Sequence, residues 1–155
     1  DYYENALKKA NAYCQASGLI TLADDSGLEV DALGGAPGLH SARYSPKPGA
    51  SDADRRAYLL ENLADYPRPW PAHFHCTLVI AIPGGEHFQF EGNCYGEILP
   101  HERGENGFGY DPVFLIRGRQ ETMAELPEEE KNLISHRGLA TIAAIPSLKK
   151  ILKIE

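Results

Sequence analysis

The chain has 155 residues, enough for one domain with a sizeable core, and 43% of its residues are hydrophobic. It carries 15 Lys and Arg against 22 Asp and Glu, and this net charge of −7 argues against binding of long nucleic acid by bulk electrostatics. The longest apolar run, residues 78–82, is far too short to span a membrane, and we expect no signal peptide. The three cysteines are widely spaced and support neither a zinc ribbon nor a disulfide framework, so a reducing cytoplasm is the simplest expectation.

The first half of the sequence predicts two helices separated by a strand and a long loop. Residues 4–17 carry apolar side chains at three- and four-residue spacing, as in an amphipathic helix that stops near Gly18. Residues 19–23 predict a buried strand that runs into a tight polar turn. Residues 34–49 are rich in Gly, Pro and Ser and predict a loop, after which Ser51 is a suitable start for a helix.

The second half predicts a hairpin, a short strand and a last helix. Residues 73–82 and 87–99 read as strands joined by a turn that contains Pro and two Gly residues. Residues 113–116 predict another short strand. Ser135 is placed to cap a last helix, which Pro146 should kink or restart. This order predicts one mixed α/β domain over residues 1–155.

The stretch Asp24-Asp25-Ser26-Gly27 places two adjacent carboxylates after the predicted strand. A hard cation such as Mg²⁺ binds through one or two carboxylates together with water and substrate phosphates. Asp and Ser side chains also stabilise turns by bonding to nearby backbone, so taken alone this stretch favours a structural turn over a catalytic site.

The loop at residues 34–45 contains several glycines and ends near Arg43. Its backbone could approach a ligand closely, and the arginine could pair with a phosphate. The alternative is a surface loop with a solvated arginine. The sequence contains no Walker-type phosphate-binding loop.

The segment at residues 104–112 places glycines on both sides of Phe108, just before Asp111. An aromatic ring presented in this way can stack on a nucleobase, and a carboxylate can accept a hydrogen bond from a base N–H. Alternatively, the aromatic side chains of this segment fill the core.

The segment at residues 128–137 brings Lys131, His136 and Arg137 near a predicted helix start, a favourable place for anions or carbonyl oxygens. The three preceding glutamates read as a solvated charge run. His73 and His75 lie two apart on a predicted strand and could bind a metal, but two ligands alone are a weak signal.

Three stretches, DDSGLEVDALGGAPGLHSARYS, GFGYDPVF and AELPEEEKNLISHRG, together resemble the inosine/xanthosine triphosphate pyrophosphatases. The resemblance covers almost the whole chain, in the family's order. It implies an elongated mixed α/β sheet with flanking helices, in two lobes around a nucleotide cleft. It also implies Mg²⁺-dependent hydrolysis of ITP, dITP and XTP to the monophosphate and pyrophosphate, usually by a homodimer.

The resemblance also implies roles for individual residues. Asp25 would be the general base and a Mg²⁺ ligand, with Asp24 in the same acidic cluster, and Phe108 would stack on the purine. His136 and Arg137 would face the 6-keto edge of the base and discriminate against adenine. The further substrate-binding residues implied are Ser26, Gly109, Tyr110, Asp111 and Lys131, with Arg43 as a less certain candidate on the phosphate side.

One feature of the family is not found in the sequence. The family's phosphate-binding loop, of the form Thr-Gly-Asn-x-x-Lys, does not occur, and we expect that this segment and a metal-binding glutamate are missing. Glu4 is the nearest acidic residue left. We therefore expect weak or no turnover, and the alternative to an active pyrophosphatase is a catalytically impaired nucleotide-binding or dimer-forming fragment.

Overall fold

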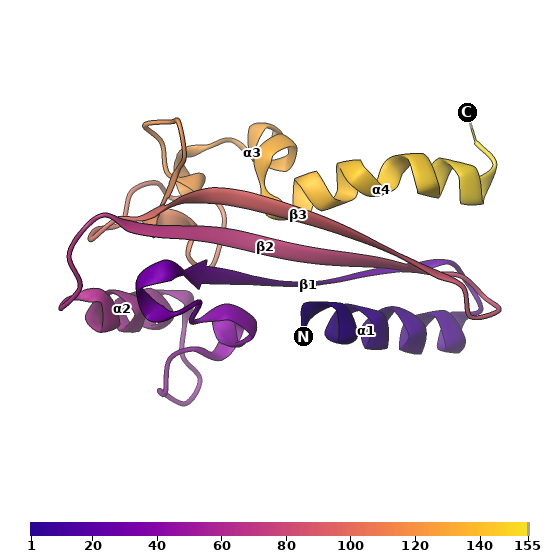
Figure 1. Ribbon diagram of the computed structural model, residues 1–155, viewed down its shortest axis with the longest axis horizontal. Helices are drawn as coiled ribbons and strands as arrows, with labels where there is room; N and C mark the ends of the chain where they lie inside the picture. Colours follow the sequence, from indigo (N-terminus) through magenta and orange to yellow (C-terminus); the bar gives the residue numbers. More distant parts are fainter. Residues whose placement is uncertain (155) are drawn as a thin grey trace. The chain divides into compact units, whose positions relative to one another are not determined.

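A computed structural model describes residues 1–154. Four strands form one antiparallel sheet in the order β1-β2-β3-β4: β1 (Thr21–Val30), β2 (Trp70–Ala81), β3 (His87–Ile98) and β4 (Phe114–Ile116). The α-helices of the described residues are α1 (Tyr2–Ser17), α2 (Asp52–Leu63), α3 (Glu128–Ile134) and α4 (His136–Leu152) (Figure 1). The predicted mixed α/β class is confirmed.

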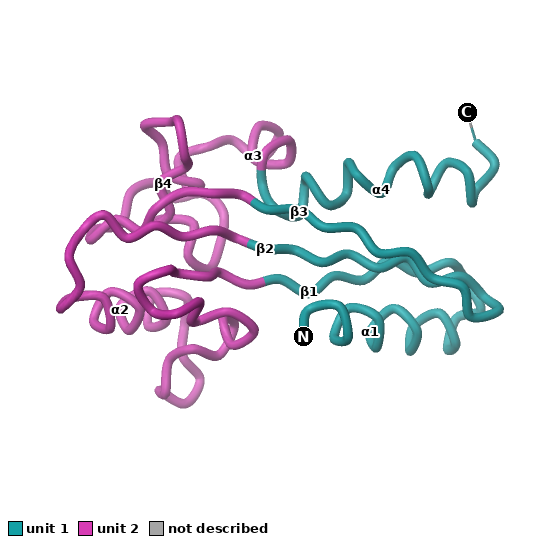
Figure 2. The backbone as a smooth tube through the Cα atoms, viewed as in Figure 1, with its two compact units in different colours: residues 1–26, 75–93, 135–155 teal, residues 27–74, 94–134 magenta. Residues whose placement is uncertain are grey.

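The chain divides into two compact units, shown in different colours in Figure 2. Unit 1 comprises residues 1–26, residues 75–93 and the chain from Ser135 onwards. Unit 2 comprises residues 27–74 and 94–134. Strands β1, β2 and β3 each contribute residues to both units, and each unit has its own hydrophobic core.

The core of unit 1 forms on both faces of β2, because successive strand side chains point to opposite faces. One face packs against α1 through Ala6, Ala10, Cys14, Val79 and Ala81. The other face packs against α4 through Cys76, Leu78, Ile80, Ala140 and Ala144. Helices α1 and α4 therefore cover opposite sides of these strands (Figure 1).

The core of unit 2 combines the remaining parts of the strands with α2. Leu59 and Leu63 of α2 are fully buried among strand and loop side chains. Phe74 and Phe114 lie with their ring centroids 4.6 Å apart. Tyr110 also belongs to this core, so one aromatic side chain of the 104–112 segment is a core residue.

The predicted helix boundaries are close to those observed. Helix α1 begins at Tyr2, two residues before the predicted start, because Asp1 forms a capping box with Glu4. Gly18 ends it with φ of 68°, a left-handed conformation that favours glycine. Ser51 caps α2 and Ser135 caps α4, as predicted.

Three predictions about local structure were wrong in detail. Residues 24–27 do not form a turn but lie within β1, which continues through them to the buried Leu28 and Val30. The predicted loop at residues 34–49 contains a 3₁₀ segment, Gly38–Arg43. Helix α4 does not restart at Pro146 but continues through it to Leu152.

Among the described residues, no helix combines the length and the apolar character needed to cross a membrane. The cysteines Cys14, Cys76 and Cys94 are buried free thiols. Burial raises the pKa of Cys76 and of Cys94 to about 11, so both thiols stay protonated near neutral pH.

Candidate functional site

The acidic group of unit 1 lies on consecutive residues of β1, where Asp24, Asp25 and Ser26 follow one another. In a strand, Asp24 and Ser26 point to one face and Asp25 to the other. The Ser26 hydroxyl accordingly donates a hydrogen bond of 2.7 Å to the Asp24 carboxylate. The two carboxylates therefore have different partners.

Asp25 is held by two side chains of α1. Lys9 Nζ lies 3.0 Å from Asp25 Oδ1, and Asn5 Nδ2 donates to Asp25 Oδ2 at 3.0 Å. Lys9 also donates to the backbone carbonyl of Asp24 at 2.5 Å. Asn5 and Lys9 share a helix face because residues four apart are neighbours on an α-helix.

Our sequence reasoning missed Asn5 and Lys9 as residues of this group. The signal was present, since the two polar residues have helical i, i+4 spacing in a helix just before the acidic stretch. The sequence did not show that this face of the helix lies against the carboxylate.

Asp24 is held by Ser26 and by Arg137, the second residue of α4, whose Nε donates to Asp24 Oδ2 at 2.9 Å. The Cys76 thiol lies 3.8 Å from the same oxygen. Burial on its own would raise the pKa of Asp24, but the hydrogen bond from Ser26 and the charge of Arg137 outweigh it, so the pKa is lowered. Asp24 is therefore charged at neutral pH.

His136 and Arg137 form the first turn of α4, where the Ser135 hydroxyl accepts a hydrogen bond from the Gly138 N–H at 3.1 Å. His136 is buried, with 7% of its surface exposed, while Arg137 is exposed. Through its hydrogen bond to Asp24, Arg137 belongs to the acidic group.

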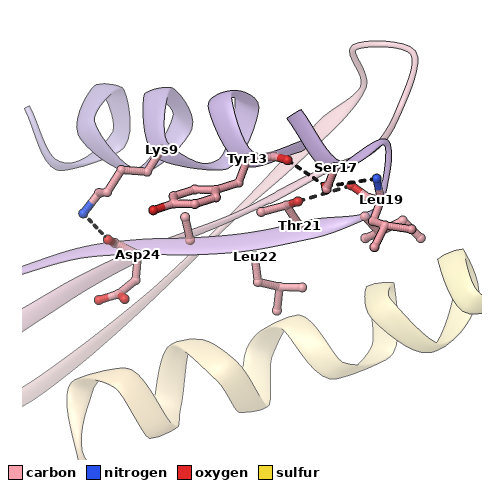
Figure 3. A pocket seen from close by; sticks show the side chains of 9 residues that line it. Lys9, Tyr13, Ser17, Leu19, Thr21, Leu22 and Asp24 are labelled. Carbon is pink, nitrogen blue, oxygen red and sulfur yellow. Dashed lines mark hydrogen bonds between the residues drawn. The ribbon is translucent and has the colours of Figure 1, made fainter. Parts of the chain in front are cut away.

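An open groove of about 660 Å³ lies beside Asp24 in unit 1 (Figure 3). Lys9 and Tyr13 of α1 and Leu22 of β1 are among the side chains that line it. Its lining combines apolar residues such as Leu19 and Leu22 with polar ones such as Ser17 and Asp24.

The aromatic group of unit 2 is centred on Phe108, a residue that is 58% exposed. Lys131 of α3 places its Nζ 4.5 Å from the centre of that ring. A cation at this distance is attracted by the electron-rich face of an aromatic ring. Lys131, which was predicted as a substrate-binding residue, therefore lies against Phe108.

Asp111 fixes the local structure around Phe108. It is 3% exposed, and its Oδ2 accepts hydrogen bonds from the Phe108 backbone N–H at 2.9 Å and from Lys131 Nζ at 2.5 Å. Gly107 has φ of 75°, and a Cβ there would lie 2.1 Å from the same oxygen. Only glycine leaves room for this arrangement.

The two residues between Phe108 and Asp111 are tied to other parts of unit 2. The Tyr110 hydroxyl donates to the Ser41 carbonyl at 2.8 Å, and burial raises the pKa of Tyr110. The Gly109 N–H donates to Asp52 Oδ2 at 2.7 Å, and its carbonyl accepts from Arg56 Nη1 at 2.8 Å. Our sequence reasoning did not single out Asp52 or Arg56.

The remaining candidates have ordinary structural partners. Arg43 Nε lies 3.3 Å from His40 Nδ1 on the exposed 3₁₀ segment. Glu4 serves the capping box of α1. His75 uses one ring nitrogen with Asn93 and the other with Thr77, each at 2.8 Å, which leaves no ring nitrogen for a metal.

The donor set of the acidic group fits a hard cation that keeps water ligands. No cluster of three or more His, Cys, Asp or Glu side chains with metal-binding geometry occurs in residues 1–154. Mg²⁺ needs only one or two carboxylates when substrate phosphates supply further oxygens. A carboxylate offers about four lone-pair sites, and Asp25 accepts one bond on each oxygen, so it retains capacity for a cation or a water.

The sequence profile of the Ham1 family matches residues 1–146. The chain belongs to the Ham1 family. A dITP/XTP pyrophosphatase of Geobacter sulfurreducens is 51% identical to this Ham1 chain over 140 residues, which are 90% of this chain and 70% of that relative. The corresponding enzyme of Desulfotalea psychrophila is 48% identical over 153 residues, 99% of this chain and 68% of its own length.

Solved Ham1 structures share this fold. A HAM1 protein from Coxiella burnetii has a TM-score of 0.88 and 42% identity, with 96% of this chain and 77% of that chain covered. The Ham1 protein of Staphylococcus aureus has a TM-score of 0.87 and 40% identity, with the same coverage. Every residue of the acidic and aromatic groups lies within the part of the chain that the Ham1 profile matches.

Proposed function

We propose that this Ham1 chain hydrolyses dITP, ITP and XTP to the nucleoside monophosphate and pyrophosphate. The supporting observation is the similarity to relatives named dITP/XTP pyrophosphatase. Their aligned parts are about 50% identical to this chain and cover at least 90% of it. The acidic and aromatic groups supply the chemistry that such a reaction needs. Removal of deaminated purines from the nucleotide pool is the corresponding biological role.

In the proposed reaction, water adds to the α-phosphorus and the bond from this phosphorus to the α–β bridging oxygen breaks, so that pyrophosphate leaves. Asp25 acts as the general base and accepts the proton of the attacking water. Asn5 and Lys9 hold its two oxygens in a fixed orientation, which favours proton transfer from one direction. Ser26 contributes as a substrate-binding residue from the same strand.

We propose Mg²⁺ as the cofactor, with Asp25 as its protein ligand. When bound, Mg²⁺ would stabilise the negative charge that develops on the phosphate oxygens. Both carboxylates have a cationic partner, Lys9 for Asp25 and Arg137 for Asp24, so the choice of Asp25 as the metal ligand rests on the family resemblance.

The purine base is bound by the aromatic group. Phe108 stacks on the base, a contact worth roughly 1–3 kcal/mol. Lys131 and the loop residues Gly109, Tyr110 and Asp111 maintain that surface.

His136 and Arg137 read the 6-keto oxygen as hydrogen-bond donors. Adenine would present an amino group to the same donors and leave buried polar groups unpaired, which discriminates strongly against it.

A substrate panel tests this function. Pyrophosphate release is measured with dITP, ITP, XTP, dATP and ATP, each with Mg²⁺ and with EDTA. We expect release from the three keto purines with Mg²⁺ and little from the adenine nucleotides. Equal cleavage of ATP would refute the specificity, and undiminished turnover in EDTA would refute the metal requirement.

The chain spans about 70% of the length of these relatives. Nucleotide binding without turnover is the second candidate function, and the same experiments distinguish it. If calorimetric titration shows that dITP binds while no pyrophosphate is released, this chain is a nucleotide-binding member of the family without turnover. If dITP does not bind at all, both forms of the proposal fail.

We propose a homodimer in the cytoplasm. The family resemblance supports the dimer, and the three free buried cysteines are compatible with a reducing compartment. Sedimentation velocity tests the dimer, for which we expect a mass twice the 17.0 kDa of one chain.

A further inference from the structure

Helix α2 holds the peptide groups next to Phe108 with a pair of opposite charges. Asp52 and Arg56 are four residues apart and therefore share a face of α2. Asp52 accepts the Gly109 N–H at 2.7 Å, and Arg56 donates to the Gly109 carbonyl at 2.8 Å. Both hydrogen-bonding groups of one loop residue are thus bound by side chains more than fifty positions earlier in the sequence.

Both side chains are themselves held in place. Arg56 is 12% exposed, and its other nitrogens bind the two oxygens of Glu102 at 2.8 and 3.0 Å. Asp52 forms an ion pair with Arg55. Bidentate, charge-assisted bonds have fixed geometry, so Arg56 connects Glu102, at the start of the loop, to Gly109, directly after Phe108.

The bonds from α2 add to the contact that Asp111 makes within the loop, because two flexible glycines flank the ring. Gly107 and Gly109 flank Phe108 with φ of 75° and 61°, and glycine has the widest choice of backbone conformations. A Cβ at Gly109 would meet nothing within 4 Å, so no close steric contact restricts this residue on that side. The bonds to Asp52 and Arg56 hold its peptide groups in place.

We propose that Asp52 and Arg56 are positioning residues, which hold the Gly109 peptide and thereby set the orientation of the Phe108 ring toward a purine base. This inference rests on the proposed function, in which Phe108 stacks on the base. Neither side chain contacts the substrate in this proposal, since both act through the loop backbone.

The test measures the dissociation constant of dITP in EDTA, where turnover does not interfere, for Asp52→Ala, Arg56→Ala and Phe108→Ala. We expect Phe108→Ala to weaken binding roughly 10- to 100-fold and each α2 variant about 3- to 10-fold. Asp52→Asn keeps an acceptor oxygen and should retain more affinity than Asp52→Ala. The matched control Arg68→Ala removes another arginine of unit 2, paired with Glu97 at 3.7 Å, and should change little.

The double variant Asp52→Ala/Phe108→Ala separates positioning from general destabilisation. If Asp52 acts through the ring, its removal causes no further loss of affinity once Phe108 is absent. The same additional loss in both backgrounds would overturn the inference. If Phe108→Ala alone leaves the affinity unchanged, the assignment of Phe108 in the proposed function fails instead.

Hydrogen exchange tests the backbone contact without any nucleotide. We expect the Gly109 amide to exchange slowly in the wild type and in Arg68→Ala, and at least tenfold faster in Asp52→Ala. Equal exchange rates in the wild type and in Asp52→Ala would overturn the inference whatever the nucleotide does.

Discussion

Asp24 and Asp25 are neighbours in sequence, but their partners give them different roles. Asp25 has the α1 side chains Asn5 and Lys9, whereas Asp24 has Ser26 and the guanidinium of Arg137. The first arrangement orients a carboxylate that still has acceptor sites. The second lowers the pKa of Asp24, so the contribution of Asp24 to the stability of the fold depends on pH.

We predict that Asp24→Asn weakens the acid sensitivity of the fold. Because the pKa of Asp24 in the folded state lies below its ordinary value of 3.8, its charge stabilises the protein above that pH. This stabilisation is lost as the pH falls through the folded-state pKa. Urea unfolding at a series of pH values should therefore show a smaller acid-induced loss of stability in Asp24→Asn than in the wild type. The control variant Asp65→Asn, at an exposed position, should lose as much stability as the wild type. Identical pH profiles for the wild type and Asp24→Asn would contradict this linkage.

Gly107→Ala should disturb the aromatic group more than Gly109→Ala does. Both glycines have positive φ, so both variants introduce backbone strain of order 1 kcal/mol. Only the Cβ at position 107 would collide with a side chain, at 2.1 Å from Asp111 Oδ2 and 2.9 Å from Lys131 Nζ. The KM for dITP should rise more in Gly107→Ala than in Gly109→Ala, and similar values would show that strain alone matters.

At the scale of single residues, the sequence predicted the residues that carry the proposed chemistry better than the residues that hold them in place. Motif residues such as Phe108, Asp111 and Lys131 were identified, and the structure brings these three into contact. Asn5, Lys9, Asp52 and Arg56 were missed, although all lie on helices that were predicted. Helical periodicity gives the face of a helix, but the partner of a polar face depends on tertiary packing.

At the scale of elements, β1 shows why a polar stretch was mistaken for a turn. Residues 24–26 are polar, and Asp, Ser and Gly favour turns in isolation. Within the fold, Asp24 bonds to Ser26 and Arg137, while Leu28 and Val30 anchor the end of the strand in a core. Tertiary contacts therefore override the local preference.

Gly92 of β3 allows α4 to approach the sheet, and we predict that Gly92→Ala destabilises the protein by about 3 kcal/mol. A Cβ at this buried position would lie 2.1 Å from the His136 carbonyl oxygen and 2.5 Å from the Ala140 backbone nitrogen. Backbone atoms of a helix cannot move aside as a flexible side chain can. Chemical denaturation should show a lowered midpoint for Gly92→Ala and little change for Glu91→Ala, an exposed neighbour on the same strand. A stability equal to that of the wild type would mean that α4 packs farther from β3.

At the scale of the whole molecule, the acidic and aromatic groups belong to different units, each with its own core. The partners described above for Asp25 belong to unit 1, and those described for Phe108 belong to unit 2. A substitution in one group therefore leaves the contacts of the other intact. This separation predicts that binding of the base and chemistry at the phosphate can be impaired independently.

Steady-state kinetics with dITP and Mg²⁺ measure that separation. Phe108→Ala should raise KM roughly 10- to 100-fold with little change in kcat, because stacking is equally present in the ground state and the transition state. Asp25→Asn should lower kcat by about 10²- to 10⁴-fold, since an amide cannot accept the proton of water, while dITP binding in EDTA stays near that of the wild type. If the Asp25→Asn variant kept the full kcat, Asp25 would not be the general base. A fall in kcat with unchanged KM in Phe108→Ala would mean that its ring acts in the transition state rather than in binding, because only an interaction confined to the transition state changes kcat alone.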